Sequence, residues 1–391
     1  MRKRSTTENS HNIILSTIGH FTVDLYPAFI IGILPLLATK FNLSIFQVST
    51  LTAVSQISNS ITQPFFGYLS DKYGIKKYMI YGLLCASLFL SLIAVAPNYL
   101  LTLIFLFLGN LGVSAYHPPS ASIGAEYKGS KKGFGNSIIS FGGNAGYAVG
   151  ALFFVSIVEK FGVNFSLLAI IPGIIISLLL YKTIPSQNSN CLTEIQVKKT
   201  RKIKIKKTKI LSIFLIWFTA FARDILWVSL LTFMPLYFAN QKINLINTSI
   251  ILLGFGLIGG VGGIFSTYFA DRIKRNILIQ IAYIIVIPLI FFIFKLNQAG
   301  SIILFILVGF FLISTVPICI SLSHELLPRN LSLASSLVVG FSSGFAGIAN
   351  MFMGKLADNI GIQNTIYILL IFPFLAFILM FFLPKLEQKL K

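Results

Sequence analysis

Apolar runs about 20 residues long constrain this chain more than any other feature of its sequence, because a helix of that length matches the thickness of a bilayer. The runs are continuous, whereas the strands of a β-barrel would alternate apolar and polar residues. Only 11% of the 391 residues are charged and 55% are hydrophobic, which leaves too little polar surface for a globule in water. The sequence therefore predicts an all-α polytopic membrane protein.

Twelve candidate membrane spans divide the chain. They cover residues 12–38, 45–69, 78–96, 99–125, 133–158, 163–182, 210–239, 246–270, 277–295, 300–325, 331–355 and 363–384. The segment between the sixth and seventh spans is longer than the other connections and strongly basic. We therefore predict an N-terminal six-helix bundle over 1–184, a basic cytoplasmic linker over 185–209 and a C-terminal six-helix bundle over 210–391.

The positive charge is distributed unevenly around these spans. Of the 31 Lys and Arg residues, 25 fall in segments on one side, 5 on the other, and Arg223 lies within a span. Lys and Arg concentrate on the cytoplasmic side of membrane proteins, so we predict a multi-pass protein of the plasma membrane with both termini in the cytoplasm. The net charge of +20 then reflects topology and attraction to anionic lipid, and we expect no nucleic-acid partner.

The two halves of the chain repeat each other. A shift of 200 residues aligns landmarks at matching places in the spans: Asp24 with Asp224, Pro35-Leu36 with Pro235-Leu236, Asp71-Lys72 with Asp271-Arg272, and Phe141 with Phe341. Six spans in each half give both halves the same orientation, so the pseudo-twofold axis should run along the membrane normal. Duplicated six-helix bundles are a transporter architecture with the substrate near the midplane.

A short charged stretch between the second and third spans carries a family resemblance. Gly67–Lys77 reads Gly-Tyr-Leu-Ser-Asp-Lys-Tyr-Gly-Ile-Lys-Lys. It resembles the loop motif of the major facilitator superfamily, Gly-x-Leu-Ala/Ser-Asp-Arg/Lys-x-Gly-Arg/Lys-Arg/Lys. With the layout of six plus six spans, the resemblance covers essentially the whole chain. It implies the major facilitator fold, which has 12 transmembrane helices as two pseudo-twofold-related six-helix bundles.

A narrower resemblance is to the fosmidomycin-resistance-type efflux proteins of that superfamily. It rests on Gly19-His20-Phe21-Thr22-Val23-Asp24, Gln63-Pro64, Tyr116-His117-Pro118 and Gly142-Gly143-Asn144-Ala145-Gly146. The resemblance implies proton-driven export of drugs or small organic anions. Two departures from the family pattern are visible. Gly150-Ala151 stands where antiporters of the superfamily often carry Gly-Pro, and the second copy of the loop motif is degraded to Thr267-Tyr268-Phe269-Ala270-Asp271-Arg272.

Ionisable residues inside the spans are costly to bury and are therefore functional candidates. Asp24 lies about halfway through the first span and Asp224 takes the equivalent place in the seventh, while His20 is one helical turn before Asp24. His117 precedes Pro118-Pro119, which we expect to break the fourth span. A carboxyl group at low dielectric can load and release a proton near neutral pH. We predict that His20, Asp24, His117 and Asp224 couple transport to protons; the alternative is that they only link helices.

Polar residues within the spans are candidates for lining a substrate cavity. Arg223 offers a bidentate fork to a carboxylate or phosphonate, or alternatively forms an ion pair between the halves with Asp24 or a similar residue. Adjacent residues on a helix point about 100° apart, so Arg223 and Asp224 need not pair. The predicted cavity residues are Arg223, Asn59, Gln63 and Asn144.

Charged and glycine residues at the predicted cytoplasmic ends suggest a gate. Asp71 would cap a neighbouring helix or pair with a basic residue, and breaking that contact would open this side. Glu126 and Glu325 should lie near basic residues of the adjoining loops. The predicted gate comprises Gly67, Asp71, Lys72, Gly74, Asp271, Arg272, Glu126 and Glu325.

Taken together, these features predict a drug:proton antiporter that exports a drug-like or anionic small molecule by alternating access. The alternative within the same fold is a proton-coupled symporter that imports a small organic metabolite. The partners would be a small-molecule substrate, protons and the lipid bilayer, and the chain would act as a monomer. We predict no enzyme activity, cofactor or metal site, because there is no nucleophile–base set or Walker A motif and the three cysteines are scattered.

Overall fold

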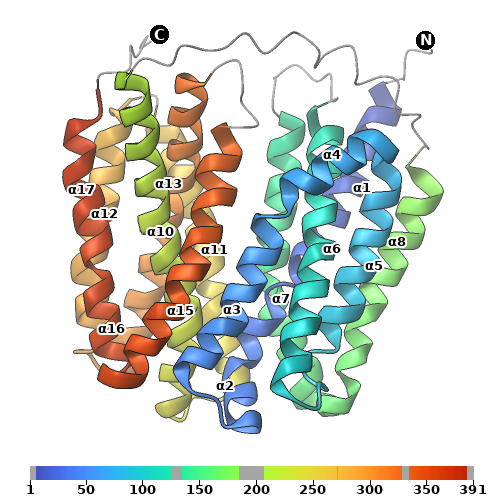
Figure 1. Ribbon diagram of the computed structural model, residues 1–391, viewed down its shortest axis with the longest axis horizontal. Helices are drawn as coiled ribbons and strands as arrows, with labels where there is room; N and C mark the ends of the chain where they lie inside the picture. The colour runs from blue at the N-terminus through green and yellow to red at the C-terminus, as the bar shows by residue number, and fades with distance from the viewer. Residues whose placement is uncertain (1–5, 126–133, 185–206, 271, 328–333, 385–391) are drawn as a thin grey trace. The chain divides into compact units, whose positions relative to one another are not determined.

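The protein is described by a computed structural model over residues 6–125, 134–184, 207–270, 272–327 and 334–384 (Figure 1). Every regular element within these ranges is a helix. The chain forms two compact units: unit 1 is Met1–Asn42 with Val54–Thr200, and unit 2 is Leu43–Ala53 with Arg201–Lys391. The predicted linker, 185–209, lies almost entirely outside the described residues.

Unit 1 is a helical bundle, coloured from blue to green in Figure 1. It contains α1 (Thr6–Leu25), α2 (Phe29–Phe41), α4 (Gln63–Tyr73), α5 (Ile75–Ser91), α6 (Tyr99–Ala125), α7 (Phe134–Phe161), η1 (Val163–Ala169) and α8 (Ile170–Thr183). Helix α3 (Ile45–Ser60) is shared, since its residues up to Ala53 belong to unit 2 and the rest to unit 1.

Unit 2 is also a helical bundle. It contains α10 (Lys207–Asn240), α11 (Leu245–Phe269), α12 (Arg275–Ile293), α13 (Gln298–Leu326), the π-helical η3 (Ser336–Phe341), α15 (Ser342–Ile360), α16 (Ile362–Leu369), α17 (Ile371–Leu379) and η4 (Met380–Phe382). Each unit packs its first long helix against a later one. Helix α1 runs along α7 in unit 1, and α10 runs along α15 in unit 2.

The predicted polytopic helical fold is confirmed. Ten helical stretches of the described residues are long and apolar enough to cross a bilayer. The other two predicted spans, 45–69 and 78–96, do not form a single helix of that length. The first is interrupted by a turn at residues 61–62 between α3 and α4, and the second forms the 17-residue α5. Pro64 lies in the first turn of α4, where its missing N–H costs no helical hydrogen bond.

The first span, Ile13–Phe41, is broken into α1 and α2 at residues 26–28. Pro27 explains the break, because a proline disfavours helical geometry at the residue before it. Tyr26 anchors the break inside unit 1: its hydroxyl donates to the carbonyl of Ala169 at 3.0 Å and accepts from the amide of Gly173 at 2.8 Å. The break places Asp24 within the last turn of α1.

The expectation that Pro118-Pro119 breaks the fourth span is wrong. Helix α6 continues through both prolines to Ala125. Two prolines remove two N–H donors, but helices packed in membranes tolerate this loss where neighbouring groups accommodate the freed carbonyls. In the turn that follows, the hydroxyl of Ser122 donates to the carbonyl of Pro118 at 3.1 Å.

Glycines on one face of α7 allow α1 to approach backbone to backbone. A Cβ atom at Gly146 would lie 2.0 Å from the carbonyl oxygen of Phe21, and one at Gly150 would lie 2.1 Å from that of Leu25. Gly142 meets the carbonyl of Thr17 in the same way, at 2.6 Å. These three glycines therefore serve the close packing of α7 against α1.

This packing leads to a stability prediction. Gly146→Ala should destabilise the protein by about 1–3 kcal/mol, because the added methyl group meets backbone atoms that cannot rotate away. Thermal unfolding of the purified protein in detergent measures the effect. Gly260→Ala on α11 is the matched control, since a Cβ atom there meets nothing within 4 Å. Equal melting temperatures for the two variants would show that α1 and α7 can separate at no cost.

A buried amide network joins the first part of α3 to the rest of unit 2. The side-chain nitrogen of Asn350 donates to the hydroxyls of Thr52 and Thr232, both at 3.1 Å, and its oxygen accepts from Ser229 at 2.8 Å. The two threonine hydroxyls are also 3.0 Å apart. Because each amide group of Asn350 has a partner, this fully buried side chain can hold α3, α10 and α15 together.

Candidate functional site

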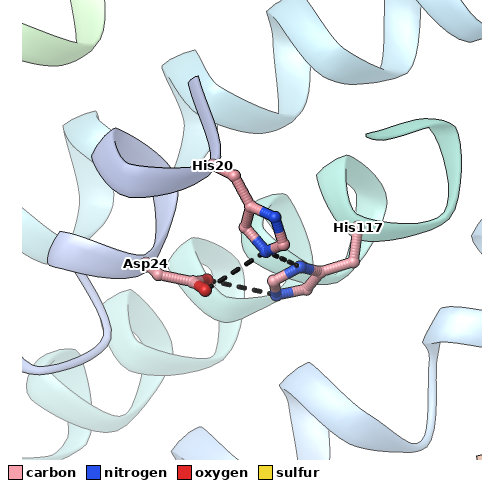
Figure 2. Close-up of side chains that lie close together, drawn as sticks. All are labelled: His20, Asp24 and His117. Carbon is pink, nitrogen blue, oxygen red and sulfur yellow. Dashed lines mark hydrogen bonds and ion pairs between the residues drawn. The ribbon is translucent and has the colours of Figure 1, made fainter. Parts of the chain in front are cut away.

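Three titratable side chains converge in unit 1 (Figure 2). His20 and Asp24 lie on α1 and His117 on α6. Nε2 of His20 is 3.2 Å from Oδ2 of Asp24, and Nε2 of His117 is 3.3 Å from Oδ1 of the same carboxylate. Nδ1 of His117 lies 3.0 Å from Nε2 of His20, so each of the three side chains contacts the other two. We call this group the unit 1 cluster.

Two features of the sequence make the cluster possible. The spacing of four residues places His20 and Asp24 on one face of α1, as the sequence predicted. On α7, a Cβ atom at Gly143 would lie 2.4 Å from Oδ2 of Asp24 and 2.9 Å from the ring of His20. A side chain at position 143 would therefore fill the space that the carboxylate and the imidazole occupy.

The contacts of the cluster suit the storage and release of a proton. When both imidazoles are neutral, His117 can donate its Nε2–H to the carboxylate of Asp24, and His20 can direct its single Nε2–H either to that carboxylate or to Nδ1 of His117. Nδ1 of His20 is buried and has no hydrogen-bond partner among the described residues. The three side chains keep 13–19% of their surface exposed, so the cluster is not sealed. One added proton would cancel its net negative charge.

Unit 2 has a second buried cluster at the equivalent carboxylate. Nε of Arg223 donates to Oδ1 of Asp224 at 2.8 Å, and the hydroxyl of Ser342 donates to Oδ2 at 2.5 Å. Arg223 is 4% exposed and Asp224 8%. Nη1 of Arg223 is buried without a hydrogen-bond partner among the described residues. We call this group the unit 2 cluster; its guanidinium has donor capacity that the carboxylate does not use.

The two clusters place the same residue type in different surroundings. Asp24 and Asp224 both lie where the first helix of a half packs against its partner, α7 or α15. At the repeat offset, Ala220 replaces His20 and Ser342 replaces Gly142. Asp24 thus contacts two imidazoles, each of which can carry or release a proton, whereas Asp224 contacts a permanent cation and a hydroxyl. Arg223 and Asp224 do pair, although their adjacent positions did not require it.

The structure also describes the remaining predicted cavity residues. Nε2 of Gln63 donates to Oδ1 of Asn59 at 3.5 Å, so these two half-buried amides at the junction of α3 and α4 contact each other. Beside them, Thr62 donates to the hydroxyl of Ser114 on α6 at 2.8 Å. Asn144 is exposed on α7, directly after Gly143, the glycine that leaves room for the unit 1 cluster.

The structure describes most of the predicted gate residues. Gly74 joins α4 to α5 with φ +97°, a conformation that favours glycine. Asp71 is exposed, and no basic side chain among the described residues pairs with it. Lys72 lies 5.1 Å from the ring of Tyr73. Gly67 on α4 faces Pro118 on α6, with 3.5 Å from an added Cβ atom to the proline.

The corresponding residues of the second half are partly described. Glu325 at the end of α13 forms an ion pair with Arg275 at the start of α12, so a basic residue of the loop between the eighth and ninth spans does lie beside it. Arg272 stacks on Tyr268 at 4.2 Å. Asp271 and Glu126 lie outside the described residues.

Two residues in contact with these helices were not predicted from the sequence. Ser342 bonds Asp224, and the repeat could have drawn attention to it because it follows Phe341, the counterpart of Phe141. Asp358 near the end of α15 accepts from the backbone amides of the first two residues of α3, at 2.7 and 3.0 Å. This carboxylate caps a helix that is distant in sequence, so no local sequence pattern predicts the contact.

Two bundles of apolar helices, each with a buried ionisable cluster, define a multi-pass membrane transporter. A family model described as Major Facilitator Superfamily matches residues 16–337. The chain belongs to this family, as its loop motif predicted.

Individual relatives agree with this assignment. The chain is 25% identical over 378 residues to the fosmidomycin resistance protein of Escherichia coli (strain K12), covering 95% of this chain and 92% of the relative. It is also 25% identical over 389 residues to the uncharacterized MFS-type transporter YfnC of Bacillus subtilis (strain 168), covering 97% and 94%. The predicted resemblance to fosmidomycin-resistance-type proteins is therefore confirmed.

A solved structure has the same fold. The crystal structure of a bacterial homolog of the human lysosomal transporter Spinster, in an inward-facing and occupied conformation, aligns with a TM-score of 0.79 and 14% identity. The alignment covers 99% of both chains. Family and fold together identify a multi-pass membrane transporter for small molecules, a class distinct from enzymes.

Proposed function

We propose that this transporter is coupled to protons and exports a drug-like or anionic small molecule by alternating access. The observation that carries the proposal is the unit 1 cluster, in which the carboxylate of Asp24 contacts both His20 and His117. An ionisable group in a membrane span is costly to bury, so its presence there points to a function. Each imidazole can accept a proton and donate one to the carboxylate that it contacts, so the cluster has the groups needed to load and release a proton.

The unit 2 cluster supports an anionic substrate. Arg223 is buried and only part of its guanidinium is paired, by Asp224. A carboxylate or phosphonate could take the unused donor through a charge-assisted hydrogen bond. The name of the Escherichia coli relative suggests fosmidomycin as the first compound to test.

Several further properties complete the proposal. The charge distribution favours a plasma-membrane protein with both termini in the cytoplasm. We propose bundles over 1–184 and 210–391 around the linker 185–209, with the chain acting as a monomer. Of the predicted gate residues, Glu325 pairs with Arg275, and this pair would latch helix ends rather than bind substrate.

A second candidate is proton symport that imports a metabolite. Gly150-Ala151 favours it, because antiporters of the superfamily often have a proline at the second position. The contact of Gly150 with the carbonyl of Leu25 shows that this position serves α1–α7 packing, a role that either direction of transport can use.

The direction of transport can be tested with purified protein in liposomes. An imposed pH gradient should drive fosmidomycin towards the acidic compartment, against its own gradient, and reversing the pH gradient should reverse the flux. In cells, expression of the chain should raise resistance to fosmidomycin. Flux of a substrate in the same direction as the protons would establish symport, and flux indifferent to the pH gradient would refute proton coupling.

A further inference from the structure

The unit 1 cluster has the composition of a metal site as well as of a proton site. His20, Asp24 and His117 each offer one ligand atom, and these atoms lie within 4.8 Å of one another. Figure 2 shows the two rings and the carboxylate close together, with each pair of side chains joined by a contact. The absence of a metal site was predicted from the scattered cysteines, and of the three ligands only His20 and Asp24 are close in the chain.

The three side chains lie close enough together to turn towards one small metal ion. Zinc binds histidine nitrogen and carboxylate oxygen at about 2.0–2.1 Å, which separates neighbouring ligand atoms of a tetrahedron by about 3.3 Å. The contacts of the cluster measure 3.0, 3.2 and 3.3 Å, and they involve both ring nitrogens of His117 and both oxygens of Asp24. One ligand atom from each side chain can be chosen so that all three lie within 4.8 Å of one another. An ion would take Nε2 of His20, one oxygen of Asp24 and one ring nitrogen of His117, and the side chains would turn to bring these atoms to the tetrahedral separation.

The chemistry of the ligands selects the ion. Two imidazoles and one carboxylate suit zinc, cobalt, nickel and related first-row ions, whereas magnesium and calcium prefer oxygen ligands alone. Three protein ligands leave at least one coordination position open. One carboxylate leaves a divalent ion with a net charge of +1 in a largely buried position, which favours an anion as the additional ligand.

We propose that unit 1 binds a divalent first-row transition-metal ion through His20, Asp24 and His117. The site goes beyond the proposed function and does not depend on it, since metal binding requires neither a proton gradient nor a transported substrate. Gly143 contributes by its lack of a side chain, which leaves the carboxylate and the ring of His20 free to face the ion.

The test titrates the purified full chain in detergent, without a polyhistidine tag, with Co²⁺ and follows its visible absorption. The wild-type protein should show saturable binding of one Co²⁺ per chain, displaced by Zn²⁺. Losing an outer hydrogen-bond partner of a metal ligand weakens metal binding by roughly 10- to 100-fold. His117→Gln and Asp24→Asn each change a ligand itself, so each should weaken Co²⁺ binding by more than that. His324→Gln is the matched control, because His324 bonds Ser335 on another part of the fold.

A fourth variant keeps the test decisive if those substitutions impair folding, which gel filtration and melting without metal would reveal. Asp24→Cys replaces the oxygen ligand with a thiolate, so Co²⁺ should bind and produce a sulfur-to-cobalt charge-transfer band. Absence of saturable Co²⁺ binding to the wild type would overturn the proposal. Unchanged binding by the folded His117→Gln and Asp24→Asn proteins, or an Asp24→Cys protein without the sulfur band, would also overturn it.

Discussion

Asp24→Asn should reduce proton-driven transport in liposomes to the level of protein-free vesicles. Asparagine has nearly the shape of aspartate and can still accept a hydrogen bond from an imidazole, but its amide cannot take up a proton. The two imidazoles would also lose the negative charge that both of them contact at 3.2–3.3 Å. The variant should therefore fold and bind substrate, yet fail to use a pH gradient.

Two measurements separate this loss from a structural defect. Exchange of labelled for unlabelled substrate, without a pH gradient, should persist in Asp24→Asn because it needs no net proton movement. Glu159→Gln is the control, since it removes an exposed carboxylate from α7 of the same unit and should leave driven transport intact. If Asp24→Asn concentrated substrate as well as the wild type does, Asp24 would have only a structural role.

His20 and Asp24 show how far local sequence patterns reach. The spacing of four residues predicted their contact without any knowledge of the fold. His117 is 97 residues from His20, and its place in the cluster depends on how α6 packs against α1. No single-sequence pattern encodes that packing, although the cost of burying ionisable groups singled out all three residues.

The incorrect predictions of helix ends also arise from local rules that take no account of how the helices pack. Local rules predicted that Pro118-Pro119 would end a helix, but packing within the bundle keeps α6 continuous. Local rules also treated 45–69 as one helix, whereas Gln63-Pro64 begins a new one. The repeat located Asp224 because the same residue type stands at position 24. It did not locate Ser342, because the matching residue in the first half is Gly142, which has no side chain.

Asp224→Ala should destabilise the protein by about 3–5 kcal/mol, because it leaves the guanidinium of Arg223 buried without a counter-charge. Arg223 is 4% exposed, and its Nη1 already lacks a partner among the described residues. The carboxylate of Asp224 is the negative charge that pairs with this buried guanidinium. Thermal unfolding in detergent measures the loss. Ser342→Ala is the matched control: it removes one hydrogen bond from the same carboxylate and should cost about 1–3 kcal/mol.

A double substitution distinguishes a stabilising ion pair from a pair kept for transport. Arg223→Met with Asp224→Leu removes both charges, and replacing a buried ion pair with apolar side chains is often neutral or stabilising. The double variant should therefore recover most of the stability that Asp224→Ala loses while remaining unable to transport an anion. If it transported normally, neither residue would contact substrate. If it were as unstable as Asp224→Ala, the pair would contribute more through its geometry than through its charge balance.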